Sequence, residues 1–141
     1  MSTILVVEDN ILIRELVREI LEREQYQVVE ACDGKDALEK MEESAPNLVL
    51  MDIQLPMLDG YAVLHQLRRD RRFHRLPVIA LTAYAMRSDQ EKALQAGFDS
   101  YLPKPIDRAA LLQLIRNFLV QGRNAANKHS TRSSSAPAWL R

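Results

Sequence analysis

Four short apolar segments that each run into polar residues constrain the fold of this chain more than any other feature. They are residues 4–7 before Glu8-Asp9, 48–51 before Asp52, 78–81 before Thr82, and 101–102 before Pro103-Lys104-Pro105. Strands that read as continuous apolar runs are usually buried on both faces, which indicates a parallel sheet covered by helices. Open sheets of this kind bind ligands at the carboxyl ends of their strands. The sequence therefore predicts that three carboxylates, a hydroxyl and an ammonium group meet at one site.

Helical patterns alternate with the apolar segments. Asn10, Asp33 and Asp107 stand where N-caps would begin three helices, and residues 88–91 fit a capping box whose helix stops at Gly97. Five strands alternating with five helices predict an α/β fold, in which a doubly wound parallel sheet forms a three-layer α/β/α sandwich. In the flavodoxin-like strand order 2-1-3-4-5, the ends of strands 1 and 3 lie side by side.

The length of 141 residues suits one domain with a single core. We expect this domain to occupy residues 1–121, and we expect residues 122–141, which are Ser-rich and lack acids, to form a disordered basic tail. Every acidic residue lies at or before Asp107, so the formal net charge of zero combines a mildly acidic body with a basic tail. Because such a body does not attract polyanions, phosphate chemistry requires a local cation.

The environment expected for the protein is the cytoplasm. No segment approaches the roughly 20 apolar residues that span a bilayer, and the N-terminus lacks the pattern of a secretory signal. We therefore expect no membrane partner. Cys32 is the only cysteine, so no internal disulfide is possible, and a buried, inert thiol is predicted.

The carboxylates predicted at the strand ends favour a magnesium site. Clustered carboxylates repel one another, and burial increases that cost unless a cation is present. Mg²⁺ takes oxygen ligands, keeps some of its waters and pairs with phosphate oxygens. We expect Asp9 and Asp52 to bind it directly, Glu8 to hold a metal-bound water, and the backbone carbonyl of Gln54 to complete the set.

A carboxylate beside a divalent cation can also act as a nucleophile toward phosphorus, which forms an acyl phosphate. Asp52 is the predicted nucleophile. The Thr82 hydroxyl is expected to donate a hydrogen bond to one phosphoryl oxygen, and the Lys104 ammonium to pair with another. Nothing in the sequence activates a protein hydroxyl as the nucleophile instead.

With these residues in this order, the chain resembles the receiver domain of two-component response regulators, of the single-domain type similar to chemotaxis regulators. The resemblance spans about residues 3–121. It rests on Glu8-Asp9, Asp52 followed by Leu55-Pro56 and Asp59-Gly60, Leu81-Thr82-Ala83, Gly97, and residues 101–105.

The resemblance implies roles for the predicted site residues. Asp52 is then the phosphoacceptor, Asp9 and Asp52 bind Mg²⁺ with Glu8 close by, and Thr82 and Lys104 contact the phosphoryl group. Glu8 stands where the family more often has Asp. Because that residue usually acts through water, the longer side chain is expected to be tolerated.

The resemblance also implies roles for residues around this centre. The backbone of Gln54 and Ala83 is expected to bind the phosphoryl group, and Tyr101 to be the switch aromatic that responds to Thr82. The Lys104–Pro105 peptide is expected to be cis. Gln54 and Tyr84 are expected to influence the phosphate lifetime, with Tyr84 partly shielding the acyl phosphate from water.

The function implied is that of a phosphoacceptor switch in a two-component system or phosphorelay. A sensor histidine kinase or a histidine phosphotransfer protein would donate the phosphoryl group. The altered surface of the fourth helix, fifth strand and fifth helix would bind a downstream protein or a second copy of the chain. The protein would not be an enzyme, beyond phosphorylating itself from small donors and dephosphorylating itself.

Three alternatives stay open at this point. A haloacid-dehalogenase-type phosphohydrolase requires Asp-x-Asp-x-Thr after strand 1, where this chain has Glu8-Asp9-Asn10-Ile11. A flavodoxin-like cofactor binder requires an anion-binding loop at the same place, and two carboxylates there would repel phosphate. A receiver that binds its partners without phosphorylation is the third.

The basic residues between the third helix and the fourth strand form a further cluster: Arg68, Arg69, Arg71, Arg72 and Arg75. Contact with nucleic acid is conceivable, but no DNA-reading module follows the cluster. A solvated connection is the favoured interpretation, and no nucleic-acid partner is expected.

Overall fold

The computed structural model describes residues 1–83 and 86–130 of the chain. Within them, five strands alternate with five helices: β1 (Thr3–Val7), α1 (Ile11–Arg23), β2 (Gln27–Ala31), α2 (Gly34–Ser44), β3 (Leu48–Asp52), α3 (Gly60–Arg69), β4 (Val78–Thr82), α4 (Arg87–Ala96), β5 (Ser100–Pro103) and α5 (Arg108–Ser130). The strands are parallel and lie in the order β2-β1-β3-β4-β5. The predicted fold class and strand order are confirmed.

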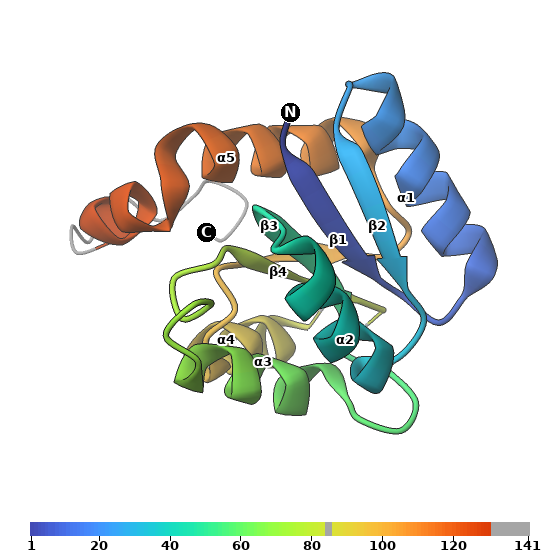
Figure 1. The fold of residues 1–141 in the computed structure, drawn as a ribbon. Coiled ribbons are helices and arrows are strands. Elements are labelled where there is room, and N and C mark those ends of the chain that lie inside the picture. Colours follow the sequence, from blue (N-terminus) through green and yellow to red (C-terminus); the bar gives the residue numbers. More distant parts are fainter. Residues whose placement is uncertain (84–85, 131–141) are drawn as a thin grey trace.

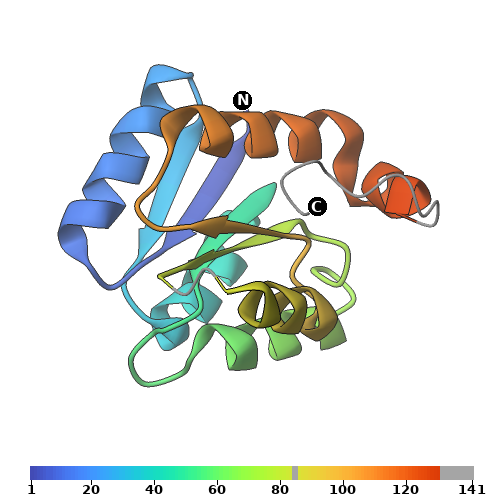
Figure 2. The ribbon, with the colours of Figure 1, turned by 180° about the vertical axis from the view of Figure 1, so that it is seen from behind.

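The sheet is the middle of three layers, with α1 and α5 on one face and α2, α3 and α4 on the other (Figures 1 and 2). Successive strand residues point to opposite faces. In β1, Ile4 and Val6 therefore pack in the core beneath α1 and α5, whereas Leu5 and Val7 pack in the core beneath the other three helices. Both faces are apolar because both are covered, which explains the continuous apolar runs of the sequence.

Strand register brings the polar strand ends to one edge of the sheet. β1 lies next to β3, so the acidic pair that follows β1 emerges beside the end of β3. Asp52 at that end pairs with Leu81 of β4, and Thr82 pairs with Pro103 of β5. The predicted convergence of strand ends is therefore present in the backbone itself.

Most helix boundaries follow the predicted caps. Asn10, Asp33 and Asp107 each accept a hydrogen bond from a backbone amide in the first turn of the helix that follows. α4 ends where predicted, because Gly97 takes the left-handed conformation with φ of 114°.

The start of α4 differs from the prediction. The capping box placed the N-cap at Ser88, whereas α4 begins at Arg87 with Met86 as its N-cap and no side-chain hydrogen bond at that cap. The Met86 carbonyl accepts hydrogen bonds from the amides of Asp89 and Gln90, at 3.0 and 3.1 Å. Backbone bonds, rather than a serine side chain, thus define this helix start.

The end of α5 also differs from the prediction. Residues 122–141 were predicted to form a disordered tail, but α5 continues to Ser130. Gly122 costs only about 1 kcal/mol relative to alanine inside a helix, and Ala125 and Ala126 are strong helix formers. Residues 131–141, the rest of the predicted tail, lie outside the described residues.

Two features bear on the expected environment of the protein. Cys32 is exposed, so the predicted buried thiol is wrong. It directly follows β2, which is an edge strand of the sheet. Among the described residues, no helix is both long enough and apolar enough to cross a membrane.

Candidate functional site

Three carboxylates meet at the carboxyl edge of the sheet. Each of Glu8, Asp9 and Asp52 has an oxygen atom within 4.8 Å of one from each of the other two. Glu8 is fully buried and Asp52 nearly so, whereas Asp9 is exposed. A cation bound here would therefore face protein on one side and solvent on the other, which suits an ion that keeps some of its waters.

Lys104 lies between two of these carboxylates. Its Nζ is 2.6 Å from Glu8 Oε1 and 3.0 Å from Asp52 Oδ2, and its side chain is 17% exposed. The Lys104 amide donates to the Thr82 carbonyl at 2.8 Å, which holds the end of β5 against β4. The peptide bond that follows, Lys104–Pro105, is cis, as the resemblance implies.

Burial and charge act in opposite directions on this ion pair. Burial raises the pKa of Glu8 to about 7, and the negative charge of Asp52 adds to that rise, while hydrogen bonds from Lys104 and the Asn10 amide oppose it. Burial alone would lower the pKa of the Lys104 ammonium, but its bonds to Glu8 and Asp52 outweigh this and raise it. The ammonium therefore stays charged and stabilises the clustered carboxylates.

The loop after β3 fixes the other side of Asp52. The Gln54 amide donates to Asp52 Oδ1 at 2.9 Å, so both carboxylate oxygens are oriented. Gly60 packs directly behind this loop, and a Cβ there would lie 2.7 Å from the Asp52 carbonyl oxygen. Only glycine allows this approach, because the neighbouring atoms belong to the backbone and cannot turn away.

The remaining predicted residues lie on β4 and β5 or just beyond. Thr82 and Tyr101 are both buried, and Tyr101 pairs with Ala80 on the neighbouring strand. Ala83 is exposed immediately after β4. Tyr84, expected to shield the acyl phosphate, lies outside the described residues.

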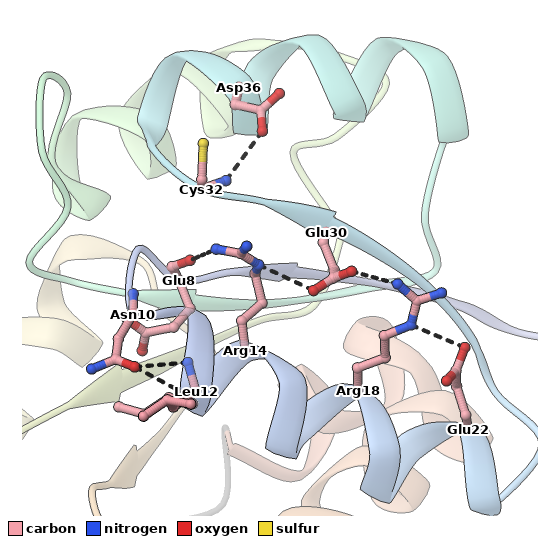
Figure 3. Close-up of polar contacts among 10 residues, drawn as sticks. Glu8, Asn10, Leu12, Arg14, Arg18, Glu22, Glu30, Cys32 and Asp36 are labelled. Carbon is pink, nitrogen blue, oxygen red and sulfur yellow. Dashed lines mark hydrogen bonds and ion pairs between the residues drawn. The ribbon is translucent and has the colours of Figure 1, made fainter.

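Two contacts to Glu8 were not predicted. The Asn10 amide donates to Glu8 Oε2 at 3.1 Å. Arg14 Nη1 donates to the Glu8 carbonyl at 2.8 Å (Figure 3). Arg14 lies in the first turn of α1 and also contacts Glu30 at the end of β2. The only signal in the sequence is an arginine shortly after the acidic pair and an acidic residue near the end of the adjacent strand.

Two members of the basic cluster, Arg68 and Arg72, are paired with acidic side chains. The Arg68 side chain is 15% exposed and forms an ion pair with Asp99 at 2.8 Å, so the solvated interpretation is wrong for this residue. Arg72 is exposed but is paired with Glu42 and Asp70.

Comparison with known proteins agrees with this architecture. Residues 4–116 match the family model of the response regulator receiver domain. The polar-differentiation response regulator DivK of Brucella ovis is 38% identical over 118 residues, covering 84% of this chain and 96% of DivK. DivK of Brucella abortus gives the same values.

Solved structures show the same relationship. The receiver domain of the sensor histidine kinase PA1611 from Pseudomonas aeruginosa, which has a magnesium ion coordinated in its active-site cleft, superposes with a TM-score of 0.78 at 37% identity. The match covers 84% of this chain and 98% of that one. The chemotaxis response regulator CheY4 of Vibrio cholerae also has a TM-score of 0.78, at 26% identity over 83% of this chain and 98% of its own.

The fold and the strand-end site define a signalling phosphoacceptor of two-component systems. The chain belongs to the response regulator receiver domain family.

Proposed function

We propose that Asp52 is the phosphoacceptor of this receiver domain and that residues 1–121 constitute the functional unit. The observation that carries this role is the fixed carboxylate, which the Lys104 ammonium and the Gln54 amide hold from two sides inside an acidic cluster. In the transfer, an Asp52 oxygen forms a bond to phosphorus while the phosphorus–nitrogen bond of a phosphohistidine breaks. The departing imidazole keeps that electron pair.

The acidic cluster supports Mg²⁺ as the cofactor. Its donors are all hard oxygen ligands, and the exposed Asp9 leaves room for water. Asp9, Asp52 and the Gln54 carbonyl are the proposed direct ligands, while Glu8, which is paired with Lys104 and accepts from the Asn10 amide, acts indirectly. When bound, the ion neutralises charge on the phosphoryl oxygens during transfer.

Contacts on β4 and β5 support the switch. The proposal assigns phosphoryl contacts to the Thr82 hydroxyl, the Lys104 ammonium and the backbone of Gln54 and Ala83. Since Thr82 ends the strand next to Asp52, a new dianion would draw its hydroxyl inward. Tyr101, buried on the neighbouring β5, would then move and alter the surface formed by α4, β5 and α5. That surface is proposed to bind a downstream protein or a second copy.

The phosphodonor is proposed to be a phosphohistidine protein that docks over α1. Asp52 is only 4% exposed, so a donor can reach its carboxylate only by approaching closely at the carboxyl edge of the sheet. Ile11, Leu12 and Leu16 are large apolar side chains, 55%, 73% and 47% exposed, and α1 begins directly after the acidic pair. An apolar surface beside a polar site favours a protein donor. We propose that the donor is the phosphohistidine of a cytoplasmic sensor kinase or histidine phosphotransfer protein.

Small phosphodonors are proposed to react as well, because the nucleophile and its supporting groups all belong to this chain. Incubation with Mg²⁺ and acetyl phosphate, followed by intact mass measurement, tests the proposal. One phosphoryl group is expected on the wild type and none on Asp52→Asn. Asp59→Asn is the matched control, because Asp59 lies on the same loop, caps α3 by accepting from the Ala62 amide, and can still do so as asparagine.

Other outcomes of this experiment would contradict the proposal. An adduct on Asp52→Asn would place the phosphoacceptor elsewhere. Steady turnover of many phosphate esters by the wild type would instead support the aspartate-nucleophile hydrolase. For the switch, phosphorylation is expected to change amide hydrogen exchange in α4 and β5, and unchanged exchange would favour a binding domain that does not respond to phosphorylation.

A further inference from the structure

The peptide between Glu8 and Asp9 is bound by Arg14, a residue that does not belong to the acidic cluster. Arg14 Nη1 donates to the Glu8 carbonyl at 2.8 Å, and Arg14 Nε donates to Glu30 Oε1 at 3.1 Å (Figure 3). Both side chains are mostly covered, with Arg14 17% and Glu30 25% exposed. The guanidinium thus connects the end of β1 to the end of β2, because two of its nitrogens donate to groups on different strands. The planar, rigid guanidinium suits such a two-sided contact.

This contact completes the positioning of Glu8. The Glu8 amide donates to the Ala31 carbonyl at 3.0 Å, and its carboxylate forms an ion pair with Lys104 and accepts from the Asn10 amide. The Glu8 carbonyl is the remaining polar group of this residue, and Arg14 binds it. Every polar group of Glu8 therefore has a partner that restrains it.

Restraining the Glu8 carbonyl also restrains Asp9. The carbonyl of Glu8 and the amide of Asp9 belong to one planar peptide, so fixing the carbonyl direction fixes the plane from which Asp9 departs. Asp9 is the exposed member of the acidic cluster. Its approach to a cation therefore depends on a backbone whose orientation Arg14 sets.

Arg18 provides an internal comparison. It lies one turn further along α1, also binds Glu30, and pairs with Glu22 at 3.1 Å, with its side chain 45% exposed. Arg14 and Arg18 thus share the same acidic anchor on β2. Arg14 additionally binds the Glu8 carbonyl, which lies beside the proposed metal ligands. A comparison of the two arginines therefore distinguishes the effect of anchoring α1 to β2 from the effect of orienting the site.

We propose that Arg14 is a positioning residue of the phosphorylation site, which holds the Glu8–Asp9 peptide in the orientation that Mg²⁺ binding requires and uses Glu30 as its anchor. This inference rests on the proposed function, since it assumes that the acidic cluster binds Mg²⁺. It extends that function to a side chain that touches neither the phosphoacceptor nor the phosphoryl group.

The test compares Arg14→Met with Arg18→Met by three measurements. Titration calorimetry with MgCl₂ gives the Mg²⁺ dissociation constant, intact mass after acetyl phosphate gives the phosphorylation rate, and urea unfolding without Mg²⁺ gives the stability of the apo protein. Losing a contact made directly to a metal ligand typically weakens metal binding by about 10- to 100-fold. Arg14 contacts the peptide that precedes Asp9 rather than a ligand itself, so we expect the lower end of this range, roughly tenfold, for Arg14→Met. Arg18→Met is expected to bind Mg²⁺ like the wild type.

The apo stability separates positioning from a purely structural role. Both variants remove one arginine contact to Glu30, but Arg14→Met also removes the partner of the Glu8 carbonyl, so it is expected to lose more stability than Arg18→Met. A lower Mg²⁺ affinity in Arg14→Met than in Arg18→Met, with both apo proteins still folded, supports positioning. Equal Mg²⁺ affinities in Arg14→Met and wild type would overturn it. If Arg14→Met does not fold, Arg14→Lys serves instead, since a single ammonium cannot reproduce the two-directional contact and is also expected to weaken binding.

The same measurements distinguish failure of the inference from failure of the proposed function. A wild type without measurable Mg²⁺ binding would refute the proposed cofactor, and the inference with it. Normal Mg²⁺ binding and phosphorylation in both the wild type and Arg14→Met would refute only the positioning role of Arg14.

Discussion

Substitution of Arg68 by methionine is predicted to destabilise the fold strongly, although the residue belongs to a sequence cluster that looks solvated. Its guanidinium forms an ion pair with Asp99 at 2.8 Å. It also donates five hydrogen bonds to the backbone carbonyls of Phe73, His74, Leu76 and Gly97. Arg68 thereby connects the end of α3 with the loop before β4 and the loop after α4.

The magnitude follows from burial. Arg68 and Asp99 side chains are 15% and 6% exposed, and Asp99 Oδ2 also accepts from the Val78 amide at 2.8 Å. Removing one partner of a buried ion pair costs about 3–5 kcal/mol, because the other charge stays buried without compensation. Since Arg68 retains some exposure, we expect a loss of about 3 kcal/mol in the free energy of unfolding. For a domain of this size, that lowers Tm by about 10 °C.

Urea unfolding followed by far-UV circular dichroism measures the loss. The midpoint is expected to fall while the dependence on urea concentration keeps its slope. Arg69→Met is the matched control, because Arg69 is the exposed neighbour on the same helix, and surface changes usually stay within about 0.5 kcal/mol. Asp99→Asn completes a double-mutant cycle, in which the double variant should lose less than the sum of the single variants.

Two results would refute this reasoning. A loss below about 1 kcal/mol for Arg68→Met would mean that the ion pair contributes as little as an exposed one. Additive losses in the cycle would mean that Arg68 and Asp99 stabilise the protein independently. Either result would mean that the buried pair of Arg68 and Asp99 does not stabilise the fold as expected.

Two further predictions concern the site and its donor. Because burial raises the folded pKa of Glu8 from 4.5 to about 7, its contribution to stability in Mg²⁺-free buffer is expected to be full below pH 4.5 and to be lost as pH rises through about 7. Urea titrations across this range should therefore show that the free energy of unfolding depends less on pH in Glu8→Gln than in the wild type. The same pH dependence in both proteins would contradict the raised pKa of Glu8. Leu12→Ser is expected to accept phosphate from acetyl phosphate normally but more slowly from a phosphorylated histidine phosphotransfer protein that is active on the wild type. Equal slowing with both donors would argue against docking over α1.

The sequence was sufficient to predict the sheet and the charged side chains that meet at its carboxyl edge. The buried strands were recognisable in the sequence as apolar runs, because helices cover both faces of the sheet. Glu8, Asp52 and Lys104 were predicted to meet because each closes or follows a strand, and parallel strands end at one edge. This inference needed only the order of elements along the chain.

Local signals failed where two competing arrangements were close in energy. Ser88 belongs to a valid capping sequence, but the backbone carbonyl of Met86 begins α4 instead. The Ser-rich composition that begins at Gly122 predicted a disordered tail, yet α5 passes through Gly122 to Ser130. In both cases the cost of the alternative is about 1 kcal/mol, which neighbouring residues can outweigh.

What the sequence alone determined were properties that depend on near neighbours: strand burial, most helix caps and the polar residue at each strand end. What only the tertiary structure decided were pairings between distant residues, such as Arg68 with Asp99 and Arg14 with Glu30. An arginine looks the same in sequence whether it faces water or a buried carboxylate. Its partner depends on how the helices pack on the sheet. This packing pairs Arg68 with Asp99, which stabilises the fold, and Arg14 with Glu30 beside the proposed site.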